Sequence, residues 1–264
     1  MTADLKVWTA MMQDVLMNDY VVNVLSEFIA LFLLFVFGWG IYRLTRRRKL
    51  LRFFNLSESK RILVYLSHLR VQPGGAIGVD GNPRSFGESA LPLSEVSLFP
   101  IFSRLFNFVV PGVDNLPGVL RWLVISDVEV ILAPSPLKAG DVERQATFIA
   151  VGSPAYNIAS MHIENAFHPI GVIDINNSSI SIPGEKSMTD LRYALVQRVY
   201  DQSTQQTAFY VAGMSSLGTY GAAIFLARRW EYLSRRYPGA DPFCIVIRVT
   251  SDDGRQSEVV MERG

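Results

Sequence analysis

The feature that constrains this chain most is an apolar run close to its N-terminus. Residues 21–42 read VVNVLSEFIALFLLFVFGWGIY, 22 residues in which Glu27 is the single charge. At about 1.5 Å of rise per residue, a helix of this length covers roughly 33 Å, which is enough to cross the hydrocarbon core of a bilayer. Trp39 and Tyr42 lie where aromatic side chains prefer the membrane interface. The run therefore predicts a transmembrane helix.

The charges that flank this run predict its direction. Six basic residues lie in the segment RLTRRRKLLR, residues 43–52. Short basic flanks are retained on the cytoplasmic side of a membrane, so we expect the N-terminus outside and the bulk of the chain in the cytoplasm. A cleaved signal peptide has its basic residues before the apolar core, which is the reverse order. The segment is expected to remain as a single-pass anchor in the cell membrane.

The chain divides into four predicted parts. These are a short amphipathic outer segment at 1–20, a transmembrane helix at 21–42, a basic juxtamembrane segment at 43–52 and a cytoplasmic α/β domain at 53–264. The last part has 18 basic and 20 acidic residues, so it lacks the positive surface that a nucleic-acid backbone requires. A single cysteine excludes an intramolecular disulfide framework. With this one cysteine and three histidines, we predict no metal site.

The large domain alternates between strand-like and helix-like segments. Strands are expected at 61–69, 128–134, 146–154, 171–175, 179–183, 193–201 and 207–213, and helices at 93–109, 120–124, 158–167 and 217–237. Residues 243–262 read as two strands joined by a tight turn, Asp-Asp-Gly-Arg. This order predicts an α/β fold, a three-layer and mostly parallel sheet with an antiparallel edge hairpin.

Three loops rich in glycine follow predicted strands, at the sheet edge where α/β proteins bind ligands. The first is PGGAIGVDGNPRSFGES at 73–89, the second leads from Gly152 to Asn157, and the third begins at Gly213. Glycine lets main-chain N–H groups approach a phosphate or ribose closely. The candidate ligand contacts are Ser67, Gly74, Gly75, Asp80, Arg84, Gly152, Ser153, Tyr156, Asn157, Gly213, Gly218 and Thr219.

The second and third loops also have interpretations that need no ligand, whereas the length of the first favours a functional role. Gly218 suits close packing of a helix on a strand as well as phosphate binding, and Ser153 and Asn157 are common helix caps. The third loop has the glycine spacing of a P-loop without its lysine, and the dinucleotide-binding glycine fingerprint is absent. The loops alone do not name a cofactor.

Two short stretches resemble TIR domains. Val64-Tyr65-Leu66-Ser67-His68 looks like the end of their first strand, and Ser153-Pro154-Ala155-Tyr156, followed by Ser160 and Glu164, is similar to a later strand-to-helix motif. The resemblance implies a Rossmann-like nucleotide-binding sensor fold of the broad TIR and SLOG type. In NAD-cleaving TIR domains the glutamate of this motif is catalytic, which makes Glu164 the candidate catalytic residue.

Three functions follow from these observations. The leading expectation is a membrane-anchored sensor or regulatory domain that binds a nucleotide-like or phosphorylated small molecule. The second is an NAD glycohydrolase that uses Glu164, with Ser153 or Tyr156 near the ribose. The third is a scaffold subunit without a ligand. Whether the chain is an enzyme, and whether it forms a homo-oligomer, stays open at this stage.

Overall fold

A computed structural model defines the fold. The structure describes residue 8 and residues 19–56, 61–67, 70–72, 75–77, 83–84, 97–106, 128–135, 138–143 and 147–264. The chain forms two compact units, Met1–Arg47 and Arg48–Gly264. The predicted outer segment at 1–20 and the predicted helix at 120–124 lie almost entirely or entirely outside the described residues.

The apolar run lies within one long helix, α2 (Asp19–Phe53). Most apolar side chains of residues 21–42 are exposed, including Phe28, Phe35 and Phe37 at 70%. Within the described residues, α2 is the helix whose length and hydropathy suffice to cross a membrane, and a signal sequence meets the same two criteria. The basic residues at 43–52 continue this helix without a break.

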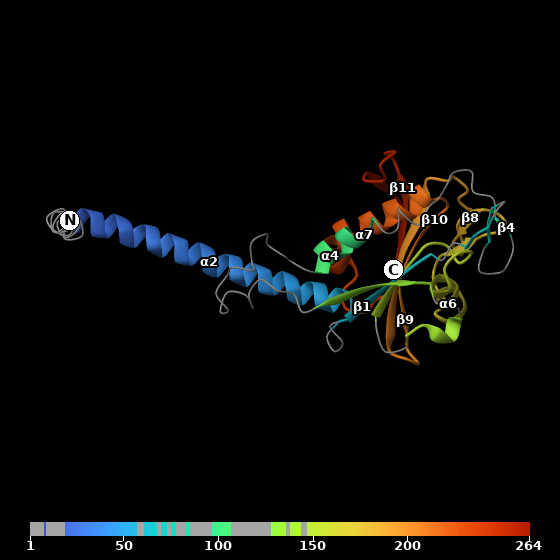
Figure 1. The fold of residues 1–264 in the computed structure, drawn as a ribbon, viewed down its shortest axis with the longest axis horizontal. Coiled ribbons are helices and arrows are strands. Elements are labelled where there is room, and N and C mark those ends of the chain that lie inside the picture. The colour runs from blue at the N-terminus through green and yellow to red at the C-terminus, as the bar shows by residue number, and fades with distance from the viewer. Residues whose placement is uncertain are drawn as a thin grey trace. The chain divides into compact units, whose positions relative to one another are not determined.

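The second unit contains a mixed seven-stranded sheet, drawn in Figure 1. Its strands are β1 (Arg61–Leu66), β5 (Glu129–Pro134), β6 (Thr147–Val151), β9 (Tyr193–Asp201), β10 (Gln206–Gly213), β11 (Phe243–Val249) and β12 (Ser257–Arg263). Their order is β12-β11-β9-β10-β6-β1-β5. β5, β1, β6 and β10 are parallel to one another, and β9, β11 and β12 pair antiparallel. The α/β class, parallel core and antiparallel edge are confirmed, but the antiparallel part also includes β9.

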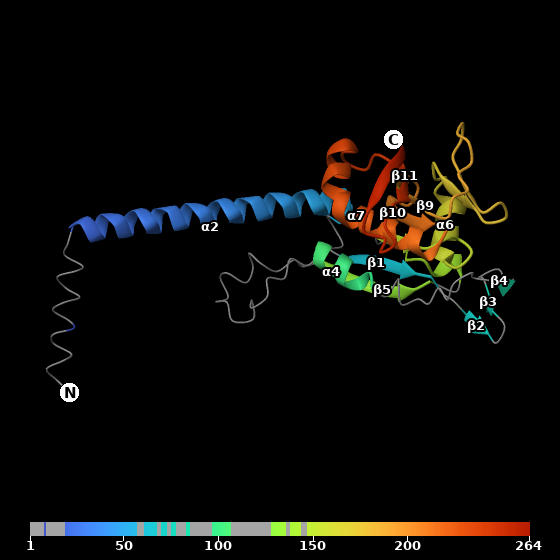
Figure 2. The ribbon, with the colours of Figure 1, turned by 90° about the horizontal axis from the view of Figure 1, so that it is seen from above.

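Alternate residues of the strands face two hydrophobic cores. One core contains Ile62, Val64, Ile149 and Phe209 with apolar residues of α4 (Phe99–Phe106) and α7 (Ser216–Arg236). The other contains Leu63, Phe148 and Tyr210 with residues of α6 (Ile158–Ala166). Figures 1 and 2 show α4 and α7 on one face of the sheet and α6 on the other. This arrangement gives the three predicted layers.

Several predicted segments have a different form in the structure. The short strands β7 (Val172–Asp174) and β8 (Ser179–Ser181) pair with each other and not with the large sheet. The glycine-rich stretch includes β3 (Gly75–Ile77) and β4 (Pro83–Arg84), which form a small sheet with β2 (Arg70–Gln72). Helix α4 begins at Phe99, later than the predicted start at residue 93, and Pro100 lies in its first turn, where a missing N–H is tolerated. A 3₁₀ turn, η2 (Ala139–Asp141), lies between β5 and β6.

The C-terminal end of α2 is part of the first core. Leu50, Phe53, Phe54 and Leu56 are each at most 3% exposed. Asn55 adopts a left-handed conformation (φ 51°), Leu56 N donates to Leu51 O, and Asn55 N donates to Arg52 O, which together form a Schellman cap. Side-chain and main-chain atoms of Asn55 also hydrogen-bond Thr207 and Thr147. The helix therefore ends inside the α/β domain.

Two phenylalanines connect this end to the rest of the core. The ring of Phe54 lies 4.8 Å from that of Phe106 in α4 and 4.7 Å from that of Phe209 in β10. The ring of Phe53 stacks on Phe243 at 6.1 Å, between centroids. Aromatic pairs at these distances add to the free energy gained by burial.

Phe54→Ala is expected to lower the free energy of unfolding of the full-length chain by about 3–5 kcal/mol, because it leaves a cavity in the core. Urea unfolding in detergent, followed by circular dichroism, measures this change. Phe99→Ala, at a side chain that is 44% exposed, is the matched control and should change stability far less. Equal effects of the two substitutions would contradict the burial of the α2 end.

Candidate functional site

The carboxyl ends of four parallel strands form one edge of the sheet, which we call the carboxyl edge. Ser67 follows β1, Gly152 follows β6 and Gly213 ends β10, so these three predicted site residues lie at neighbouring strand ends. Ser67 Oγ donates to Val151 O at 3.3 Å, and Gly152 N donates to Val211 O at 2.9 Å. The structure thus brings the starts of the second and third loops to one edge.

Asn157 holds two of these strand ends together. Its Nδ2 donates to Tyr65 O at 2.9 Å and to Val151 O at 2.8 Å, and its Oδ1 accepts from Ala159 N as the N-cap of α6. The side chain is completely buried. All three of these polar contacts are internal, so Asn157 acts as a structural brace and helix cap.

Other polar groups in and beside the second loop make similar contacts. Ser160 Oγ donates to Gly152 O at 2.6 Å, and Ser135 Oγ accepts from Ile158 N at 2.7 Å. Ser153 O accepts from the main-chain N–H groups of Tyr156 and Asn157. The side chains of Ser153 and Tyr156 are partly exposed. Of the predicted contacts in this loop, these two are the ones whose side chains a ligand could reach.

The third loop is a packing contact between a strand and a helix. A Cβ at Gly213 would lie 2.3 Å from Thr219 N and 2.4 Å from Gly218 C, and a Cβ at Gly218 would lie 3.0 Å from Tyr193 O. Thr219 Oγ1 accepts from Gly213 N at 3.0 Å, and Ser215 caps α7 by accepting from Gly218 N. The glycines allow α7 to begin directly against the end of β10.

The first loop is described only in part. Gly74 and Asp80 lie outside the described residues, and so do His68 and the end of the predicted strand at 61–69. Gly75 lies in β3 and Arg84 in β4, and their pairing partners are Gln72 and Ala76. This loop keeps its predicted role as a ligand contact, which rests on its sequence.

Glu164 lies on the inner face of α6, toward the sheet. Its Oε1 accepts from Ile173 N in β7 at 2.9 Å and from Tyr210 Oη in β10 at 2.8 Å. Tyr210 is completely buried. Glu164 is seven residues beyond the cap Asn157, about 10 Å along the helix, so it does not lie with the loops of the carboxyl edge. Its observed contacts join α6, the β7–β8 ribbon and the sheet.

Burial determines how this pair ionises. Desolvation raises the pKa of Glu164, and the hydrogen bonds from Ile173 and Tyr210 partly oppose this rise. Burial, followed by the negative charge of Glu164, raises the pKa of Tyr210 well above its ordinary value. Tyr210 therefore remains a neutral donor to the carboxylate. A raised pKa is typical of a general acid or base, but it also arises in structural pairs of this kind.

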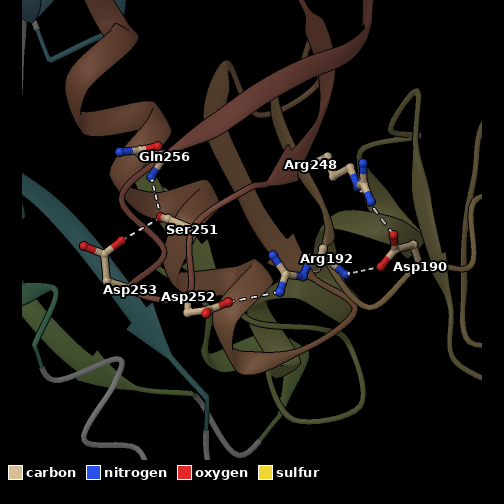
Figure 3. A network of polar contacts seen from close by, with 7 residues as sticks. All are labelled: Asp190, Arg192, Arg248, Ser251, Asp252, Asp253 and Gln256. Atoms are coloured by element: carbon tan, nitrogen blue, oxygen red, sulfur yellow. Dashed lines mark hydrogen bonds and ion pairs between the residues drawn. The ribbon is translucent and has the colours of Figure 1, made fainter.

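A network of charged residues at the carboxyl edge was not predicted from the sequence. Arg192 pairs with Asp252 at 3.0 Å, and Arg248 pairs with Asp190 at 3.5 Å. Figure 3 draws both contacts. The pair of Arg192 with Asp252 holds the β11–β12 turn beside the start of β9, and the end of β11 and this turn also pack on α7, where a Cβ at Gly221 would meet Val249 and Gly254. Within the described ranges, no three His, Cys, Asp or Glu side chains gather as metal ligands would.

A hollow lies at the opposite edge of the sheet, where β11 begins. It has a volume of about 640 Å³ and is lined by Arg236, Tyr237, Asp241, Pro242, Glu262, Arg263 and Gly264. Glu262 accepts hydrogen bonds from Tyr232, Tyr237 and Arg236, and Arg263 pairs with Glu185. None of the predicted ligand contacts lines this hollow.

Comparison with known proteins gives no match for this chain, whether to a family model, to a curated protein or to a solved structure. The geometry supports a mixed α/β sheet with a parallel core and gives no specific support for the TIR or SLOG families.

Gly213→Ala is expected to lower stability by about 1–3 kcal/mol, because the added methyl group would overlap the backbone of α7. Gly140→Ala is the control, since nothing lies within 4 Å of a Cβ at that position. Thermal and urea unfolding of the two variants measure the difference. If the two variants are equally stable, α7 does not begin against β10 as described.

Glu164→Gln is expected to keep the fold, because the amide oxygen still accepts from Tyr210 and Ile173. Glu164→Ala should cost about 1–3 kcal/mol, because it leaves the buried Tyr210 hydroxyl without its acceptor. Since the folded-state pKa of Glu164 is raised, the wild type should lose stability relative to Glu164→Gln as pH rises from the ordinary carboxyl pKa through the raised one. Urea unfolding at several pH values measures this.

Nicotinamide release from NAD provides the enzymatic counterpart of this test. A structural Glu164 predicts no release that depends on this residue. Release by the wild type that disappears in the stable Glu164→Gln variant would show that Glu164 is catalytic, as the resemblance to TIR domains implies.

Proposed function

We propose that this chain is a single-pass, membrane-anchored regulatory domain that relays the state of its carboxyl edge to its anchor. The observation that carries the proposal is the burial of Leu50, Phe53, Phe54 and Leu56, the end of α2, within the core of the α/β domain. These four residues belong to the Arg48–Gly264 unit, so the helix that carries the apolar run continues directly into the core of the domain. The basic flank after the apolar run favours an anchor with its N-terminus outside and the α/β domain in the cytoplasm.

Helix α7 supplies a connection between the two edges of the sheet. It begins at the carboxyl edge against Gly213 and has 21 residues, which correspond to about 31 Å. Its end at Tyr237 lies beside Phe243, and Phe243 stacks on Phe53 at the end of α2. A displacement of the first turn of α7 would therefore reach the end of the anchor helix through packed side chains.

The proposed input is a nucleotide-like or phosphorylated small molecule at the carboxyl edge. Ligands of open α/β sheets bind at this edge, and Ser67, Ser153 and Tyr156 are partly exposed there. The contacts described for Asn157, Gly213, Gly218 and Thr219 are internal to the fold, so the proposal depends on these exposed side chains and on the first loop. No observation favours a second function over this one.

Two measurements on the full-length protein test the proposal. For topology, the position Asp252, which is 91% exposed in its side chain, is replaced by Cys and treated with a membrane-impermeant thiol reagent in intact cells. Burial raises the pKa of the single native thiol, Cys244, to about 12, so that thiol should not react. The proposal predicts labelling only after the cells are opened. Labelling in intact cells would place the domain outside and overturn the proposal.

For the relay, the protein in nanodiscs is mixed with NAD or ATP, and amide hydrogen exchange is followed. Binding should slow exchange at the carboxyl edge and change exchange at Phe54 and Leu56. Binding without a change at the end of α2 would contradict the relay. The absence of binding by any nucleotide tested would contradict the proposed ligand class.

A further inference from the structure

Arg198 is a charged residue inside the first core. It lies in β9, in the apolar strand YALVQRVYD, and is completely buried. In the register of the sheet it lies opposite Phe209 of β10 and Phe243 of β11. A buried guanidinium is costly unless its donors are satisfied, so its partners determine its role.

The partners of Arg198 come from the ends of two helices and from the loop that follows one of them. Its Nη1 donates to Phe53 O, in the last turn of α2, at 3.2 Å. Its Nη2 donates to Tyr237 O, the C-cap of α7, at 2.9 Å and to Asp241 O at 2.5 Å, and its Nε also donates to Asp241 O at 2.9 Å. We call Arg198 with these three carbonyl oxygens the Arg198 clamp.

The electrostatic environment suits a cation. Main-chain carbonyls at helix C-termini carry partial negative charge, and the clamp joins two such ends. The guanidinium carbon also lies 5.1 Å from the ring centroid of Phe53 and 5.2 Å from that of Phe243. Burial lowers the pKa of Arg198 to about 10, opposed by the nearby charge of Asp241. The group therefore remains charged at neutral pH.

We propose that Arg198 is the positioning residue that locks the end of helix α2 to the end of helix α7, so that the two ends open and close together. The planar guanidinium group of Arg198 donates to main-chain carbonyl oxygens from three segments. If the end of α2 moves away and frees Phe53 O, one of the four hydrogen bonds that hold the guanidinium in place is lost. The inference deepens the proposed relay and rests on it for its consequence. The clamp is the point at which a movement of α7 would be passed to the anchor helix.

Hydrogen exchange of the wild-type protein in nanodiscs tests the clamp without any substitution. The amide of Leu56 is bonded to Leu51 O in the cap of α2, and the amide of Tyr237 is bonded to Leu233 O at the end of α7. Joint opening predicts the same protection factor for these two amides under mildly destabilising urea. Protection factors that differ by tenfold or more would overturn the inference.

Arg198→Lys gives the second arm of the test, because an ammonium group cannot span the three carbonyls. Exchange at Leu56 and Tyr237 should accelerate roughly 10- to 100-fold, the loss expected for hydrogen bonds to a charged group. Amides in the middle of β10, such as Phe209, should accelerate much less. Arg228→Lys is the matched control, since Arg228 is exposed on α7 and makes a hydrogen bond to Arg255 O.

Equal acceleration at Leu56, Tyr237 and Phe209 in Arg198→Lys would show a general loss of stability and overturn the clamp. Unchanged exchange at Leu56 would do the same. If Arg198→Lys does not fold, the wild-type comparison still decides the question. If thiol labelling places the domain outside the cell, the proposed relay fails, whereas the exchange results for the Arg198 clamp still hold. Failure of the relay and failure of the clamp are therefore distinguishable.

Discussion

The end of helix α2 and the residues after it, up to Leu56, are buried in the first hydrophobic core, and the rest of the structure depends on this contact. The last turns of α2 are amphipathic: Leu50 and Phe53 face the core, whereas Arg48, Lys49 and Arg52 are exposed. Burying a leucine or phenylalanine side chain contributes about 1.5–3 kcal/mol, so the apolar face has a strong preference for the core. The basic face remains free for solvent or for lipid headgroups. Residues 48–53 can therefore contribute both to the basic flank of a membrane span and to the core of the domain.

The two edges of the sheet have different roles in this arrangement. At the carboxyl edge, Asn157, Ser160 and Thr219 use their side chains to hold strand ends and helix starts in place. At the opposite edge, Arg198 gathers the ends of α2 and α7. Helix α7 runs between these two edges and packs on β9, β10 and β11. Helix α7 thus connects the carboxyl edge to the buried end of α2 through packed side chains.

The strands and helices were predictable where a local pattern is strong. β9, α6, α7 and the β11–β12 hairpin agree closely with the segments expected from their sequence. The two helices have caps, the hairpin has a turn that contains glycine, and β9 is a nearly continuous apolar run. The β7–β8 ribbon was expected only as two strands, since three-residue strands do not reveal their partners. The buried end of α2 was missed because its basic residues obscured the apolar spacing of Leu50, Phe53 and Phe54.

The roles of single polar residues were less predictable. The contacts of Glu164 with Tyr210 and Ile173 join segments that are 46 and 9 residues away in the chain, and no local pattern indicates them. Arg198 and Gln197 were visible as polar residues within an apolar strand, which is a sign of internal hydrogen bonding. Their partners are main-chain oxygens and a main-chain N–H group, which any sequence provides. The sequence therefore could not specify the clamp.

The central claim is that the end of α2 belongs to the core of the α/β domain. The most direct test is a pulsed electron paramagnetic resonance distance between nitroxide labels at Arg52→Cys and Arg229→Cys, in the full-length protein in a lipid bilayer. Both positions are exposed, and the buried Cys244 should not take up the label. The account predicts one narrow distance distribution between the end of α2 and the middle of α7. A broad distribution would show that the helix end moves independently of the domain and would contradict the account.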